Sequence, residues 1–137
     1  MKRLTDLWIR IAVAYFAVGV LMGAAMGASH NFTLRPVHAH VNLLGWVSMF
    51  LMGLLHQHLA DSLNLRLARV QFWIYQTAVP VMLFALTGLM LGHAALEPVL
   101  GLASIAVCVS VLILTLNVLW SGATRSGEAK SLAARAG

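Results

Sequence analysis

One stretch of the chain decides its fold: Arg35-Pro-Val-His-Ala-His-Val-Asn-Leu-Leu-Gly-Trp-Val-Ser-Met-Phe-Leu-Met-Gly-Leu-Leu-His56. It places two closely spaced histidines, His38 and His40, at the start of an apolar segment that is long enough to cross a membrane. Pro36 suits the first turn of a helix, because its fixed φ and its missing N–H cost nothing there. We therefore expect a helix to begin near Pro36, with both histidines in its first two turns.

The spacing of these two histidines directs their side chains apart. Two residues along an α-helix correspond to a rotation of about 200°, so the imidazoles leave the helix on nearly opposite sides. A pair that chelates one ion would need a spacing of three or four residues, or an irregular backbone. One helix can therefore serve two separate sites.

The composition is that of a membrane protein. Hydrophobic residues make up 61% of the 137 residues and charged residues only 9%, against about 25% charged in typical soluble domains. Four apolar runs of 17 to 23 residues are long enough to span a hydrocarbon core of about 30 Å. The sequence predicts an all-α membrane protein, a four-transmembrane-helix bundle over residues 1–120, with helices at about 7–27, 36–58, 70–92 and 98–120. A cytoplasmic tail over 121–137 lacks a sizeable apolar face, and we expect it to be disordered or frayed.

The positive charges predict the orientation. With a cytoplasmic N-terminus, eight basic residues fall on the cytoplasmic side and only Arg35 falls opposite; the eight are Lys2, Arg3, Arg10, Arg66, Arg69, Arg125, Lys130 and Arg135. This asymmetry predicts two cytoplasmic termini in a bacterial-type inner membrane. The formal net charge of +5 is then explained by topology and anionic lipid, and not by nucleic-acid binding.

Gly19, Gly23 and Gly27 share one face of the first helix, because they recur at every fourth position. Small residues at this spacing let another backbone approach closely. The face could pack within the chain, form a subunit interface or give a smooth wall against a flat macrocycle. We expect the chain to self-associate through it as a homo-oligomer. A cleaved signal peptide is the competing interpretation of this segment, but the apolar run is longer than the usual core of one.

Four of the six histidines, His30, His38, His40 and His93, gather on the predicted outer, periplasmic side. An imidazole at membrane depth is costly and is by default a functional hypothesis. The competing interpretation places these side chains at the headgroup boundary, hydrogen-bonded to water and carbonyls. His56 and His58 lie about 27 Å away along the helix, and we expect them to be interfacial side chains without a ligand. Because Cys108 is the only cysteine, any heme must be held non-covalently.

The segment from His38 to Gly53 resembles the histidine-bearing tenth helix of the catalytic subunit of heme-copper oxidases, and most closely the cytochrome-cbb type and the nitric oxide reductases. The likeness rests on His38-Ala-His40 followed by Leu44-Gly-Trp-Val47, and it extends more weakly over residues 36–92, where Gln71-Phe-Trp-Ile-Tyr75 looks like the start of the next helix. In that family the first histidine of the pair ligates the active-site heme and the second ligates the low-spin heme. The resemblance therefore implies these roles for His38 and His40. The chain has no counterpart to the copper-ligating histidines or the cross-linked tyrosine, so oxygen reduction at a heme-copper pair is not implied.

Two function classes follow. The first is a small b-type heme protein that transfers electrons or reacts with a small gas or a quinol, with His40 and His38 as ligands and His93, or a histidine of a second subunit, as the opposite axial ligand. The second is a binding or assembly protein for heme or copper, in which His38, His40 and His93, with His30 as a further candidate, hold the metal. An absorption spectrum of the purified protein separates them.

Overall fold

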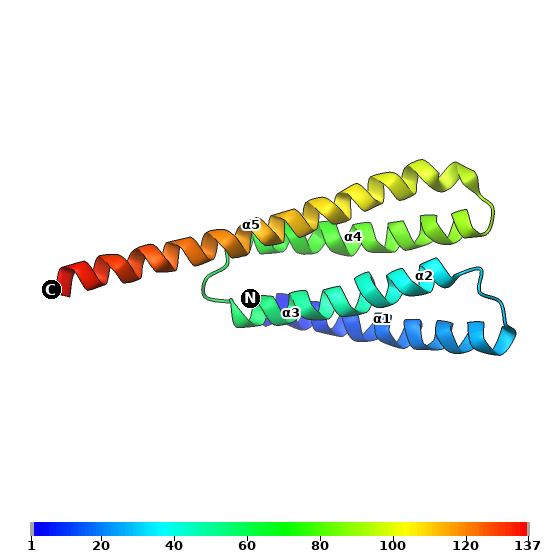
Figure 1. The fold of residues 1–137 in the computed structure, drawn as a ribbon, viewed down its shortest axis with the longest axis horizontal. Coiled ribbons are helices and arrows are strands. Elements are labelled where there is room, and N and C mark those ends of the chain that lie inside the picture. Colours follow the sequence, from blue (N-terminus) through cyan, green and yellow to red (C-terminus); the bar gives the residue numbers. More distant parts are fainter. Residues whose placement is uncertain (1, 137) are drawn as a thin grey trace.

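The computed structural model describes the backbone of residues 2–136 and the side chains of residues 2–121, and the described part is helices joined by short turns (Figure 1). Its elements in chain order are α1 (Lys2–Ser29), α2 (Arg35–His40), the π-helix η1 (Val41–Ser48), α3 (Met49–His58), α4 (Leu65–Met90), the 3₁₀-helix η2 (Ala94–Leu96) and α5 (Glu97–Ala136). Within the described residues, four helical segments are long and apolar enough to cross a membrane: Lys2–Ser29, Arg35–His58, Leu65–Met90 and Ala94–Ser121. The prediction of an all-α chain with four such segments is confirmed.

The helices form two antiparallel hairpins (Figure 1). α1 packs against α3 and η1 in the first hairpin, and α4 packs along α5 in the second. The start of α1 and the loop over 59–64 lie at one end of the molecule, here named the basic end. The loops over 30–34 and 91–93 lie at the opposite end, here named the histidine end.

Two helices begin earlier than the apolar runs predict. α1 begins at Lys2 and not at about residue 7, and α4 begins at Leu65 and not at about residue 70. Asn64 fixes the start of α4, because its Oδ1 accepts hydrogen bonds from the backbone N–H groups of Arg66 at 2.9 Å and Leu67 at 3.3 Å. Both helices thus extend at their N-terminal ends beyond the apolar stretch, into residues whose charged side chains are exposed.

The second long segment begins as predicted but is not a regular α-helix. α2 starts at Arg35 with Pro36 in its first turn. The chain then widens into η1, an eight-residue π-helix, which is much longer than the single-turn bulges that most proteins contain. The wider segment packs on two tyrosines: the Leu44 carbonyl accepts a 3.2 Å hydrogen bond from the Tyr75 hydroxyl, and Gly45 leaves room for the Tyr15 ring.

The glycine face of α1 is covered from within the chain. A Cβ added at Gly19 would lie 2.5 to 2.9 Å from the side chain of Asn42, and one at Gly23 would lie 3.0 Å from Cε1 of His38. Gly27 alone of the three has no such neighbour within 4 Å. At Gly19 and Gly23 the face therefore packs within the chain, which was one of the three alternatives, and the expectation that it is free for a second subunit is wrong at these two positions.

The C-terminal segment also differs from expectation. α5 continues from Glu97 to Ala136, so the backbone over 121–136 is helical where we expected a disordered or frayed tail. The segment contains no proline and many alanines and long polar residues, which have high helix propensity. Pro80 lies inside the continuous helix α4.

The largest buried side chains join the two hairpins nearer the basic end. The Trp8 ring of α1 lies edge-on to two rings of α4, with centroid distances of 5.0 Å to Phe72 and 5.5 Å to Tyr75. Met49 of α3 is also fully buried in this core. Aromatic contacts of this size, and not close backbone approach, hold α1 and α4 together.

Candidate histidine site

His38 is partly buried and faces α1. Its Cε1 atom lies over Gly23, so a methyl group added at Gly23 would be in tight contact with the imidazole ring. The Asn42 amide nitrogen lies 3.4 Å from Nδ1 and 3.5 Å from Nε2 of His38 and also donates a 2.8 Å hydrogen bond to the His38 carbonyl. Because the amide is almost equally far from both ring nitrogens, it faces the imidazole without making a directed bond to either one.

The orientation of the His40 ring is fixed by a hydrogen bond. Its Nδ1 lies 2.8 Å from the Pro36 carbonyl oxygen, one turn earlier in the same helix. A carbonyl can only accept, so Nδ1 carries the proton and Nε2 keeps a lone pair. Histidines that bind metals are usually oriented in this way, with one ring N–H donated to a carbonyl or carboxylate and the other nitrogen left to ligate.

The two histidines belong to one short α-helical segment with different surroundings. Both lie in α2, before the π-helix begins, so the rotation of about 200° between them holds. His38 is packed between Gly23 and Asn42, whereas His40 forms a hydrogen bond within its own helix.

His30 and His93 lie on exposed turns at the same end of the molecule (Figure 1). His30 directly follows α1 and has a left-handed conformation with a φ of 51°. His93 follows Gly92, whose φ of 94° turns the chain out of α4. The backbone N–H of His93 donates a 2.9 Å hydrogen bond to the Gly88 carbonyl, which fixes the turn but leaves the imidazole exposed.

The four predicted site residues therefore share an end of the molecule without forming a closed metal cage. Among the residues that the structure describes, no group of three or more His, Cys, Asp and Glu side chains could hold a metal ion. A groove of about 290 Å³ also opens at this end, and its lining includes Met22, Met26, Leu34 and Leu91 but no histidine.

A buried polar cluster at the other end of the second span was not predicted. His56 is fully buried, so the expectation of an interfacial side chain is wrong for it, while His58 is exposed. The His56 ring stacks on Trp8 with a centroid distance of 6.1 Å, and its Nδ1–H donates to the Met52 carbonyl at 2.7 Å. Gln71 of α4, also fully buried, lies next to Met52, with 3.3 Å between Nε2 and Sδ.

Three polar atoms of this cluster are buried without a partner. They are Nε1 of Trp8, Nε2 of His56 and Oε1 of Gln71. Nε1 can only donate, Gln71 Oε1 can only accept, and Nε2 accepts once Nδ1 carries the proton. Such groups lower stability, since each loses its water without gaining a bond.

Residue spacing could have revealed this burial. Met49, Met52 and His56 recur at three and four residues and so occupy one face of α3. All three are buried. An imidazole that continues an apolar stripe is therefore a core residue, although it lies only two residues before the end of the helix.

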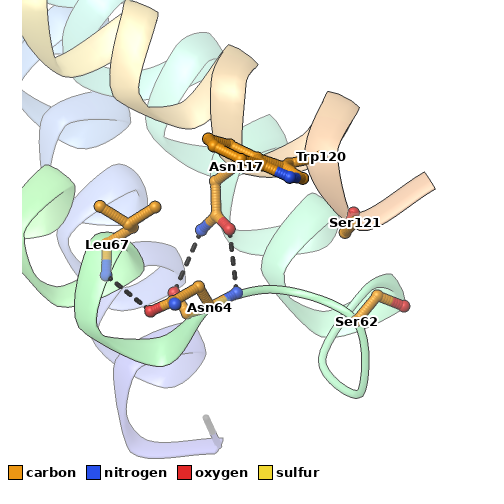
Figure 2. Close-up of a pocket in the computed structure, with 6 residues that line it drawn as sticks. All are labelled: Ser62, Asn64, Leu67, Asn117, Trp120 and Ser121. Atoms are coloured by element: carbon orange, nitrogen blue, oxygen red, sulfur yellow. Dashed lines mark hydrogen bonds between the residues drawn. The ribbon is translucent and has the colours of Figure 1, made fainter. Parts of the chain in front are cut away.

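The loop between the hairpins is fixed by a pair of asparagines (Figure 2). The Asn64 backbone N–H donates to Oδ1 of Asn117 at 2.9 Å, and Nδ2 of Asn117 donates back to the Asn64 carbonyl at 3.1 Å. The groove beside them, of about 320 Å³, also has Leu67 and Trp120 in its lining and no charged residue. The pair of asparagines fixes where α4 starts relative to α5.

Comparisons with known proteins give no relative: no protein-family model matches the chain, and searches of curated proteins and of solved structures find no match.

Proposed function

We propose that this chain is a multi-pass protein of a bacterial-type plasma membrane, with both termini in the cytoplasm and the histidine end on the periplasmic side. The support is the distribution of charge along the helices. Lys2, Arg3, Arg66 and Arg69 belong to the basic end, whereas Arg35 starts the helix at the histidine end. Basic residues are retained on the cytoplasmic side of bacterial membrane proteins.

We further propose that the histidine end would hold b-type heme, with His40 as one of its ligands. The observation that carries the proposal is a hydrogen bond from Nδ1 of His40 to the Pro36 carbonyl, made by a ring that is only partly buried. It selects the tautomer in which Nε2 has a lone pair and fixes the plane of the ring. A ligand that is oriented before binding loses less entropy when it binds.

His38 is the candidate for the second direction, toward a second heme, a metal or an open reactive position. Gly23 and Asn42 hold its ring from two sides. Because α1 closes this side of the helix, a group that binds at His38 lies within the first hairpin. The two imidazoles thus serve separate sites, as the H-x-H resemblance implies.

A second histidine that would hold the heme together with His40 has two candidates. His93 lies at the same end on a turn of its own, with its side chain exposed. A histidine from a second copy of the chain is the other candidate, and a homo-oligomer supplies it. The glycine face of α1 is covered, so the interface between copies uses other apolar faces, such as that of α5 with exposed Leu102, Ile105 and Leu112.

The function that follows is electron transfer, or redox chemistry with a small gas or a quinol. Heme supplies the one-electron chemistry. The chain supplies ligation by His40, ring orientation through Pro36 and an apolar surround that sets the potential.

The test is the absorption spectrum of the purified protein and its variants. We expect sharp reduced α and β bands, lost in His40→Ala and converted to a high-spin spectrum in His93→Ala if His93 is the opposite ligand. His58→Gln is the matched control, because His58 is exposed at the basic end, and its spectrum should be that of the wild type. An unchanged spectrum in His40→Ala refutes the assignment. A colourless protein with stoichiometric copper supports a metal-binding or assembly protein instead.

A further inference from the structure

A second groove lies between the two hairpins at the basic end. It has a volume of about 520 Å³ and runs between the first two turns of α1 and the first turns of α4. It lies at the opposite end of the molecule from the histidine end, so it is independent of any heme site.

The groove gathers positive charge without neutralising it. Lys2 and Arg3 of α1 and Arg69 of α4 line it, and its lining contains no acidic residue. The nearest carboxylate along α1 is Asp6, which lines a neighbouring groove together with Arg3 and Arg10. Cations from two helices that face one groove repel each other, so an anion bound between them offsets a cost of the fold.

The rest of the groove is apolar and aromatic. Leu7 is 45% exposed, and Trp73 is 65% exposed. Phe72 closes the floor, because it is buried against Trp8. An exposed indole next to basic residues at the end of an apolar helix is typical of the boundary between headgroups and hydrocarbon. The groove thus combines basic side chains with an apolar and aromatic wall.

We propose that this groove binds an anionic phospholipid. Its phosphate lies among Lys2, Arg3 and Arg69, and an acyl chain lies along Leu7 and Trp73. Basic grooves between helices on the cytoplasmic side of a membrane suit such headgroups. The proposal rests on the proposed membrane location and not on heme. α1 and α4 belong to different hairpins, and their backbones make few contacts with each other. The bound lipid therefore connects the two hairpins.

The test compares lipids and variants in nanodiscs and by native mass spectrometry. We expect the wild type to retain phosphatidylglycerol in preference to phosphatidylcholine. Each of Arg3→Gln and Arg69→Gln should weaken retention about fivefold and the double variant about 25-fold, at roughly 1 kcal/mol for each cation. Arg69→Lys should retain the lipid, because it keeps the charge. Arg66→Gln is the matched control, since Arg66 is on the same helix but outside the groove.

Fluorescence locates the bound lipid. Phosphatidylglycerol with brominated acyl chains should quench part of the tryptophan emission, and Trp73→Phe should remove that part. Retention in the double variant equal to that of the wild type overturns the proposal, as does equal retention of phosphatidylcholine. Complete displacement by inorganic phosphate also overturns it, because the site would then be one for free phosphate. The heme spectrum is measured on the same samples, so that failure here is distinguished from failure at His40.

Discussion

His40 and His56 make the same type of side-chain hydrogen bond in different surroundings. Each donates Nδ1–H to a carbonyl four residues earlier, at 2.8 Å to Pro36 and 2.7 Å to Met52. His40 is partly exposed, whereas His56 is fully buried and its Nε2 has no partner. The surroundings, and not the hydrogen bond, separate a candidate ligand from a core residue.

Replacing His56 by phenylalanine should leave stability unchanged or raise it. The substitution removes a buried acceptor without a partner and keeps a ring of similar shape against Trp8. His56→Ala should instead lower the free energy of unfolding by about 2 to 4 kcal/mol, because it opens a cavity. Thermal unfolding in detergent measures both. A loss of more than about 2 kcal/mol in His56→Phe would show that a ring nitrogen of His56, Nδ1 with its bond to the Met52 carbonyl or Nε2, is essential for stability.

Gly23 should be sensitive to substitution because of His38. Gly23→Leu brings side-chain atoms into the space of the imidazole and should cost about 1 to 3 kcal/mol. Gly27→Ala is the control, since a Cβ there meets open space; it should stabilise by up to about 1 kcal/mol through helix propensity. Unfolding curves and the imidazole nitrogen shifts of His38 test this. Equal behaviour of the two variants would mean that His38 does not lie on α1.

At the scale of elements, the start of α4 is determined by two asparagines. Asn64 caps the helix, and Asn117 of α5 holds both backbone groups of Asn64 (Figure 2). Asn117→Ala removes two hydrogen bonds in a buried position, and we expect a loss of about 1 to 3 kcal/mol. Thr115→Ala should change stability by less than about 0.5 kcal/mol, because Thr115 is exposed and bonds only its own helix. Chemical or thermal unfolding compares them, and equal losses would contradict the role given to Asn117.

At the scale of the whole molecule, the four segments form two hairpins with large exposed apolar faces, which suits a lipid environment. We predict that single cysteines at Lys2 and Lys130 react only with reagents that reach the cytoplasm, and that one at Asn31 reacts from outside. Cys108 is first replaced by alanine to remove the background. Labelling of position 2 or 130 from the periplasm would reverse the proposed orientation.

The sequence by itself determined the number of long helices, the helix start at Pro36 and the gathering of four histidines at one end. These follow from local rules: apolar length, the backbone constraint of proline and the alternation of direction between successive spans. Its charge asymmetry also predicts an orientation, which the labelling experiment tests.

Tertiary structure decided what each side chain faces. The glycines of α1 are covered by Asn42 and His38, the ring that stacks on His56 is Trp8, and residues 41–48 form a π-helix that packs on Tyr15 and Tyr75. Each of these depends on how the neighbouring helix is rotated and how closely it approaches. That information is carried by pairs of side chains far apart in the sequence, and a periodic pattern within one helix does not contain it.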